Sequence, residues 1–289
     1  FENPIDSSNM NPDKWVDIAT VIADNYALFD GFVVLHGSDT MSYSASALSF
    51  MLENVAKPVI FTGSQLPIGD LRTDAKENLI TAIQIASLRN NNEPVVREVC
   101  LYFEYKLYRG NRTTKINAEH FQAFTSPNYP ELVESGVHLK LNSDLFLPLI
   151  KDKKLQVHKN LDTNVAIIKL FPGISETVLA AILNIPNLKG VVLETYGAGN
   201  APTEDWFLNL LKKAIGAGLH IINVTQCSGG SVRMGQYETS TGMKAIGVIS
   251  GKDITTEAAI TKLMFLLGQK TDPKDFKTAF ETSLRGEMI

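Results

Sequence analysis

The sequence predicts an α/β protein with two parallel-sheet domains, the N-terminal one larger than the C-terminal one. Short, continuous apolar segments alternate with helical segments along the 289 residues, which is typical of parallel strands joined by helices. Between Ala123 and Leu161 prolines interrupt this alternation, and it then begins again. We therefore expect an N-terminal domain over residues 1–155 and a C-terminal domain over residues 163–289.

The N-terminal half is predicted to contain three helices and three strands. The first helix begins at Pro12, after the cap residue Asn11, and extends to about Phe29. Further along, Asp74 and Glu77 have the spacing of a capping box. The remaining elements are strands over residues 31–35, 58–62 and 98–104, a helix over 41–55, and a helix that ends at Leu88.

The C-terminal half repeats the alternation of strands and helices. Ser175 and Thr203 have side chains that cap helix N-termini, and the helices behind them are expected to end near Leu183 and Ala217. The other predicted elements are strands over residues 165–170, 191–195 and 220–225, and helices over 255–267 and 275–284.

Charge and hydropathy exclude two classes of partner. The formal net charge is −4, the isoelectric point is about 5.8, and no block of basic residues stands out. Nucleic-acid-binding domains are usually basic, so we expect no nucleic-acid partner. The longest apolar stretches are far shorter than the ~18 residues that a membrane-spanning helix needs. We therefore expect no membrane partner either.

The cysteines and histidines give no sign of a metal site. Cys100 and Cys227 each have apolar neighbours and are predicted to be buried free thiols. Without a disulfide framework, a reducing compartment is favoured. The five histidines are scattered, and no pair of Cys or His has the spacing of metal ligands. We expect neither a metal nor an organic cofactor.

Polar loops follow several of the predicted strands. In open α/β sheets, ligands bind at the carboxyl ends of the strands. Each position alone also has an ordinary explanation, since Ser, Thr and Asp cap helices and a lone lysine is usually a solvated surface charge. These loops are Ser38-Asp39-Thr40, Gly63-Ser64-Gln65, Thr113-Thr114-Lys115 and Gly197-Ala198-Gly199-Asn200.

A hydroxyl, a lysine and a carboxylate together can form a nucleophile without histidine. A neutral lysine takes the proton of the hydroxyl, and the carboxylate orients the lysine and offsets its charge. Such a lysine must be partly desolvated for its pKa to fall into a useful range. In the strand-end loops Lys115 is such a lysine and Asp39 such a carboxylate, and hydroxyls are present at Ser38, Thr40, Ser64, Thr113 and Thr114.

Seven short motifs occur along the chain. They are Asp6-Ser7-Ser8, His36-Gly37-Ser38-Asp39-Thr40-Met41, Thr62-Gly63-Ser64-Gln65-Leu66-Pro67, Thr113-Thr114-Lys115, Tyr196-Gly197-Ala198-Gly199-Asn200-Ala201-Pro202, Thr256-Glu257-Ala258-Ala259 and Leu284-Arg285-Gly286-Glu287. With these motifs in this order, the chain resembles the bacterial-type L-asparaginase family, and in particular its type I, cytoplasmic-like branch. The resemblance covers essentially the whole chain.

The resemblance implies hydrolysis of the side-chain amide of L-asparagine to L-aspartate and ammonia through an acyl-enzyme, without a cofactor. It implies a smaller C-terminal domain that is flavodoxin-like or Rossmann-like. Ser38 would be one of two catalytic hydroxyls, with Asp39 and Lys115 completing a triad-like group. The substrate would be bound by Asp6 and Ser7 at its amino-acid end, by Ser64 at the scissile amide, and by Asn200.

The family also implies an assembly and a location. Asn200 corresponds to a residue that reaches into the site of a neighbouring subunit, so a homodimer is the smallest complete unit. A homotetramer would be a dimer of such dimers. The type I branch implies a cytoplasmic protein.

Two departures from the family pattern bear on the expected activity. Ser38 stands where the family has threonine, so the hydroxyl remains but the methyl group that restricts χ1 is missing. The family's first catalytic residue is a threonine nucleophile in a Thr-Gly-Gly-Thr-like segment, which would lie upstream of Phe1. If the native protein truly lacks that segment, we expect little or no amidase activity.

Three other functions remain open at this stage. One is the ammonia-releasing subunit of a tRNA-dependent amidotransferase, or a glutaminase-asparaginase. Another is a non-catalytic amino-acid-binding homologue. The third is a nucleotide-dependent oxidoreductase, which rests on Gly197 and Gly199 alone, without the third glycine of a dinucleotide-binding loop.

Overall fold

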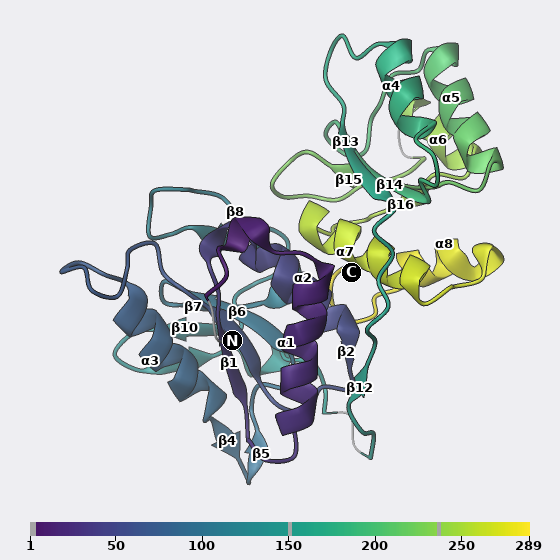
Figure 1. The fold of residues 1–289 in the computed structure, drawn as a ribbon. Coiled ribbons are helices and arrows are strands. Elements are labelled where there is room, and N and C mark those ends of the chain that lie inside the picture. The colour runs from purple at the N-terminus through teal and green to yellow at the C-terminus, as the bar shows by residue number, and fades with distance from the viewer. Residues whose placement is uncertain (1–3, 150–151, 236–237) are drawn as a thin grey trace. The chain divides into compact units, whose positions relative to one another are not determined.

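The computed structural model describes residues 4–149, 152–235 and 238–289. It has the predicted α/β class, with helices and strands in both halves of the chain (Figure 1). The chain divides into two compact units, residues 1–159 and residues 160–289. Each unit has its own sheet and its own helices, and each is described separately below.

Unit 1 contains three helices and several short 3₁₀ turns. Trp15, Ile18, Ala19 and Ile22 form the buried face of the first helix. That helix ends at Asn25, four residues before the predicted end. The helices of unit 1 are α1 (Pro12–Asn25), α2 (Met41–Met51) and α3 (Ala75–Ala86). The 3₁₀ turns of unit 1 are η1 (Ser7–Asn9), η2 (Ser38–Thr40), η3 (Gly110–Arg112) and η4 (Ser143–Leu145).

The main sheet of unit 1 has six strands in the order β1-β3-β6-β7-β10-β11. Its strands are β1 (Phe32–Leu35), β3 (Val59–Thr62), β6 (Val99–Phe103), β7 (Lys106–Arg109), β10 (Val133–Ser135) and β11 (Leu139–Leu141). Three two-stranded pairs join β2 (Leu52–Glu53) to β12 (Gln156–Val157), β4 (Arg89–Asn90) to β5 (Glu93–Pro94), and β8 (Thr114–Lys115) to β9 (Phe124–Thr125).

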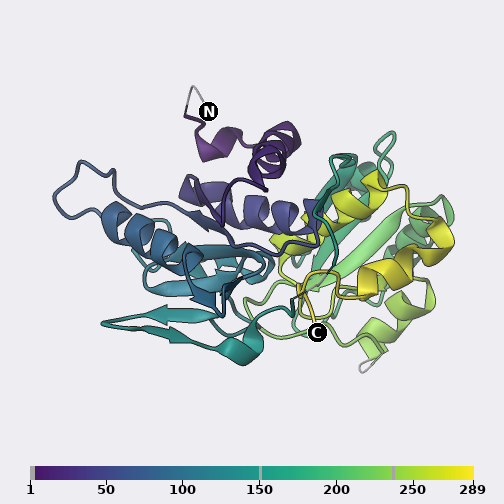
Figure 2. The ribbon, with the colours of Figure 1, turned by 90° about the horizontal axis from the view of Figure 1, so that it is seen from below.

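The parallel strands predicted for the N-terminal half are present in unit 1, but its sheet is mixed. Strands β1, β3 and β6 are parallel, but β6, β7, β10 and β11 pair in antiparallel fashion. The hairpin of β10 and β11 appears as teal arrows in Figure 2. The β6–β7 turn consists of Glu104 and Tyr105, which have φ angles of 42° and 68°. Such a turn usually carries Gly or Asn, so no turn pattern in the sequence indicated this hairpin.

Three other predictions for unit 1 need correction. The predicted strand containing β1 was expected to be buried, but β1 lies at the edge of the sheet as described and Leu35 is 66% exposed. The helix predicted over 41–55 ends at Met51 because the chain then enters β2. Asp74 and Glu77 do not form a capping box: α3 begins after Asp74, but the Asp74 carboxylate accepts hydrogen bonds from the backbone of Gln65 instead.

Unit 2 has a four-stranded parallel sheet in the order β13-β14-β15-β16. Figure 1 shows α4 and α5 on one side of this sheet and α7 and α8 on the other. The strands are β13 (Val165–Lys169), β14 (Gly190–Thr195), β15 (His220–Thr225) and β16 (Ile249–Ser250), and the helices are α4 (Glu176–Leu183), α5 (Asp205–Gly216), α6 (Glu238–Ala245), α7 (Thr256–Gly268) and α8 (Pro273–Glu281).

The parallel sheet predicted for the C-terminal half is therefore confirmed, and so is the Ser175 cap, which accepts a hydrogen bond from the backbone of Val178. Thr203 is not a cap, because α5 begins after Glu204. Helix α6 and strand β16 were not predicted. Cys100 is buried as predicted, but Cys227 is exposed, because the chain leaves the sheet after β15.

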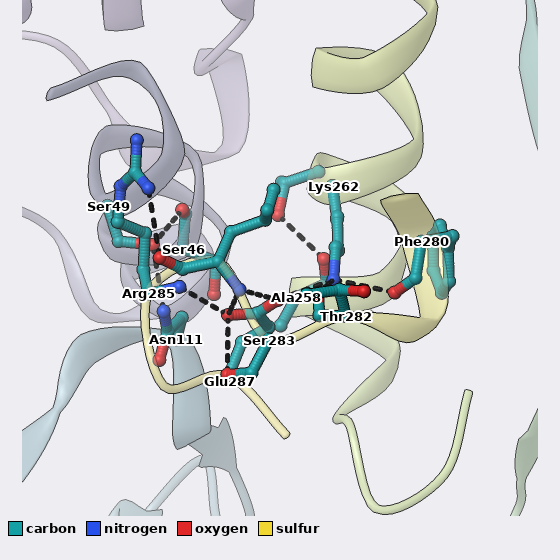
Figure 3. A network of polar contacts seen from close by, with 12 residues as sticks. Ser46, Ser49, Asn111, Ala258, Lys262, Phe280, Thr282, Ser283, Arg285 and Glu287 are labelled. Atoms are coloured by element: carbon teal, nitrogen blue, oxygen red, sulfur yellow. Dashed lines mark hydrogen bonds and ion pairs between the residues drawn. The ribbon is translucent and has the colours of Figure 1, made fainter. Parts of the chain in front are cut away.

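A buried ion pair fixes the C-terminal end of unit 2. Lys262 of α7 and Glu287 have fully buried side chains whose Nζ and Oε1 atoms are 2.5 Å apart. Lys262 also donates to the carbonyls of Phe280 and Thr282, each at 2.7 Å (Figure 3). Glu287 accepts hydrogen bonds from the backbone of Leu284. Although burial raises the pKa of Glu287, the Lys262 ammonium lowers it below its ordinary value.

Replacing Lys262 by methionine should destabilise the protein strongly. Lys262→Met leaves the Glu287 carboxylate buried without its partner, and breaking a buried pair in this way costs about 3–5 kcal/mol. Urea unfolding measures the loss. The matched control is Lys274→Met, because Lys274 pairs with Asp272 on the surface, where such pairs contribute about 0–1 kcal/mol. Equal losses for the two variants would contradict this account.

Candidate functional site

Lys115 contacts two other residues of the predicted strand-end loops, Ser38 and Asp39. Ser38 and Asp39 lie in η2, at the carboxyl end of β1, and Lys115 lies in β8. The Lys115 Nζ atom donates to Ser38 Oγ at 2.8 Å and to Asp39 Oδ1 at 2.7 Å. The Lys115 side chain is 18% exposed and that of Asp39 is 65% exposed. A mostly shielded amino group therefore contacts a hydroxyl and a partly solvated carboxylate.

A second contact of Ser38 comes from Gln65, to which the sequence analysis assigned no role. Ser38 Oγ donates to Gln65 Oε1 at 3.1 Å. The Nε2 atom of Gln65 donates to the carbonyls of Ala118 and His120. The signal that could have found Gln65 was its position beside Ser64 in the Thr62–Pro67 motif, at the end of β3.

A chain of hydrogen bonds holds the loop that carries Ser38. Trp15 Nε1 donates to Ser44 Oγ at 2.8 Å, and Ser44 Oγ lies 2.8 Å from His36 Nε2. His36 Nδ1 lies 2.7 Å from the carbonyl of Gly37. A carbonyl only accepts, so the proton is on Nδ1 and Nε2 is free to accept from Ser44. Burial lowers the pKa of His36, which favours this neutral form.

Buried cations support the segment that leads to Lys115. Arg109 Nε lies 2.6 Å from Glu98 Oε2, and both side chains are almost fully buried. Although burial alone would lower the pKa of Arg109, the Glu98 carboxylate raises it. The guanidinium groups of Arg109 and Arg112 lie 4.3 and 5.2 Å from the Tyr129 ring centroid. Arginine is usually exposed, so nothing in the sequence indicated that these two side chains are buried.

Ser7 lies close to the Ser38 loop, whereas Asp6 binds within its own turn. The carbonyl of Ser7 accepts from Thr40 Oγ1 at 2.7 Å. A Cβ atom at Gly37 would lie 2.6 Å from Ser7 Oγ, so only glycine fits there. Asp6 Oδ1 accepts from the backbone and the hydroxyl of Ser8, at 2.9 and 2.8 Å. The backbone hydrogen bond, followed by that of the hydroxyl, lowers the pKa of Asp6.

Ser64 lies on the wall of a largely apolar hollow of about 680 Å³. The carboxyl ends of β1 and β3 contribute His36 and Thr62 to this wall, and α3 contributes Leu79. Gly63 permits the two strand ends to approach, because a Cβ atom there would lie 2.1 Å from the carbonyl oxygen of His36. The hollow therefore lies at the strand ends where a ligand is expected.

Asn200 belongs to unit 2 and is described within it. It follows β14 on a tight loop in which the backbone groups of Tyr196 and Asn200 exchange two hydrogen bonds, at 2.9 and 2.8 Å. Thr225 Oγ1 of β15 donates to the carbonyl of Gly197 in the same loop at 2.6 Å. The loop is thus held at the carboxyl end of the parallel sheet.

The described residues contain neither a candidate metal site nor a membrane-spanning helix. Within these ranges, no three His, Cys, Asp or Glu side chains lie together in a way that could hold a metal ion. No helix among the same residues is long and apolar enough to cross a membrane.

The burial of His36 makes the stability of the protein depend on pH. Because the folded pKa of His36 lies below its ordinary value of 6.5, this contribution to stability is present above about pH 6.5 and is lost as the pH falls through the folded pKa. We expect the thermal unfolding midpoint to fall between pH 7 and pH 5.5, and to fall less steeply in His36→Gln. The matched control is His138→Gln, at an exposed position, which should keep the wild-type slope. An unchanged slope in His36→Gln would contradict the assignment.

The chain matches two family models that together span most of its length. Residues 1–146 match the N-terminal asparaginase domain, and residues 164–280 match the glutaminase/asparaginase C-terminal domain.

Curated relatives and solved structures agree with these matches. L-asparaginase 1 of Escherichia coli K12 is 45% identical over 98% of this chain and 82% of its own length. The 60 kDa lysophospholipase of Mus musculus is 44% identical over 98% of this chain, but the match spans only 49% of that protein. The structure of L-asparaginase I from Vibrio cholerae superimposes with a TM-score of 0.92 at 42% identity, covering 100% of this chain and 85% of that one.

These matches confirm the resemblance that the motifs predicted. They cover both units and agree in sequence and in fold. The chain belongs to the asparaginase family.

Proposed function

We propose that the protein hydrolyses the side-chain amide of L-asparagine to L-aspartate and ammonia. The observation that carries the proposal is the contact of Lys115 Nζ with Ser38 Oγ and Asp39 Oδ1, at 2.8 and 2.7 Å. In a member of the asparaginase family, this group has the parts that amide hydrolysis through a hydroxyl needs.

In the proposed reaction, Ser38 acts as one of the two catalytic hydroxyls that the family resemblance implies. Neutral Lys115 takes the proton of Ser38 Oγ, and the oxygen attacks the amide carbon. The C–N bond breaks, the nitrogen receives the proton from Lys115, and ammonia leaves an ester on Ser38. Water then attacks the ester, gives up a proton to Lys115, and releases L-aspartate as Ser38 regains its hydrogen. Asp39 orients Lys115 and offsets the positive charge that Lys115 gains.

We propose that the remaining predicted residues bind the substrate. L-Asparagine carries an ammonium and a carboxylate, which require an acceptor and donors respectively. Asp39 and Asp6 supply carboxylates, Ser7 supplies a donor at the amino-acid end, and Ser64 contacts the scissile amide. The support for this assignment is that Ser7 contacts the Ser38 loop and that Ser64 lies on the wall of the adjoining hollow.

We further propose an assembly and a location. A homodimer, or a homotetramer formed as a dimer of dimers, would let Asn200 of one subunit complete the site of another. The domains would be those predicted over residues 1–155 and 163–289. A cytoplasmic location is supported by the structural similarity to the probable cytoplasmic L-asparaginase of Campylobacter jejuni. Release of ammonia from L-glutamine rather than L-asparagine would favour the glutaminase or amidotransferase alternative.

Removing either partner of the central contact should abolish turnover. Ser38→Ala removes the hydroxyl and Lys115→Met removes the base, so each should lower kcat in the natural protein by a factor of about 10²–10⁴. Ammonia release from L-asparagine measures this, and circular dichroism checks the fold. The control Lys212→Met changes an exposed lysine of α5 and should leave kcat unchanged. Normal turnover by Lys115→Met would remove Lys115 from the mechanism.

Mixed oligomers test the role of Asn200 across subunits. If Asn200 completes a neighbour's site, Ser38→Ala and Asn200→Ala subunits should each be inactive alone. Co-expressed at equal levels, they should regain about a quarter of wild-type activity, because half of the dimers are mixed and one of their two sites is intact. No recovery in the mixture would place Asn200 in its own subunit's site, and full activity of Asn200→Ala alone would place it outside any site.

A further inference from the structure

We propose that Gln65 is a positioning residue that fixes the side chain of Ser38. The inference rests on the proposed function, in which Ser38 is the reacting hydroxyl. Three segments far apart in the sequence meet at the Gln65 amide: the end of β1, the end of β3, and the loop that follows Lys115. Their contacts involve Ser38, Gln65 itself, Ala118 and His120.

The contacts of Gln65 determine how its amide is oriented. Oε1 accepts from Ser38 Oγ at 3.1 Å, and Nε2 donates to the carbonyls of Ala118 and His120 at 3.1 and 3.0 Å. A flipped amide would direct its oxygen at two carbonyl oxygens, which cannot donate. The oxygen is therefore held toward Ser38.

The backbone of Gln65 is also fixed. Its N–H donates to both carboxylate oxygens of Asp74, at 3.1 and 3.0 Å. The Nδ2 atom of Asn78 donates to Asp74 and to the carbonyl of Gly63 at the end of β3. Asn78 is fully buried in α3. The position of Gln65 thus depends on the start of a packed helix rather than on a free loop.

Ser38 needs such support because serine lacks a branched Cβ. Its χ1 can occupy three staggered wells, whereas the additional methyl of threonine restricts that choice. In the structure, Ser38 Oγ accepts from Lys115 and donates to Gln65, so two hydrogen bonds in different directions hold one rotamer. Gln65 also directs the resting hydroxyl proton away from Lys115 Nζ. The proton must turn toward Lys115 before it can be transferred.

The test compares Gln65→Ala in two backgrounds of the natural protein. In the wild-type background, loss of one hydrogen bond to Ser38 should lower kcat about tenfold, with little change in KM. In the Ser38→Thr background, the added methyl restricts χ1, so Gln65→Ala should lower kcat by no more than about threefold. The control Gln269→Ala removes an amide that also donates to a carbonyl, that of Asn160 in unit 2, and should change kcat in neither background.

Equal losses of kcat in the two backgrounds would overturn the proposal, because a loosened 117–122 loop would damage both alike. If Ser38→Thr is itself inactive, the crystal structure of Gln65→Ala decides. Several Ser38 rotamers support the proposal, and a single unchanged rotamer overturns it. Wild-type turnover by Ser38→Ala would overturn the proposed function instead, and the Ser38 rotamers in Gln65→Ala would then still decide the positioning role.

Discussion

The side chain of Lys115 contacts Ser38, which lies 77 residues away in the sequence, and Asp39, which lies 76 residues away. These three side chains would not stay together without support from the rest of the fold, because fixing flexible side chains costs conformational entropy. The groups that support them are buried. His36 fixes the loop of Ser38, and the Arg109–Glu98 pair with Tyr129 fixes the segment before Lys115. The candidate chemistry at the surface therefore depends on polar groups inside unit 1.

Much of the fold could be predicted from local patterns, and the exceptions have physical causes. The parallel strands of unit 2 were predicted because continuous apolar runs are typical of strands covered on both faces. The antiparallel part of unit 1 was missed because β7 and β10 are short, and because Glu104 and Tyr105 adopt positive φ angles without the usual glycine. Helix α1 ended earlier than its apolar pattern suggested, since the chain turns after Asn25.

For the site, residue types were informative and positioning contacts were not. Ser38, Asp39 and Lys115 each lie in a strand-end loop and were grouped together by the resemblance to the family, and they do lie together. Gln65 was missed because its role depends on which carbonyls surround it, which only the folded chain shows. The burial of Arg112, a charged residue that is 1% exposed, was also missed because only the folded chain shows it. The catalytic and binding roles of Ser38, Asp39, Lys115, Asp6, Ser7, Ser64 and Asn200 stay predictions.

The central claim is that Ser38 and Lys115 act as one chemical unit. The most direct measurement is kcat for L-asparagine in Ser38→Ala, Lys115→Met and the double variant. Residues that act as a unit are grossly non-additive, so the account predicts that the double variant is about as slow as either single variant. Losses that multiply in the double variant would show that the two side chains act independently, which would contradict the account.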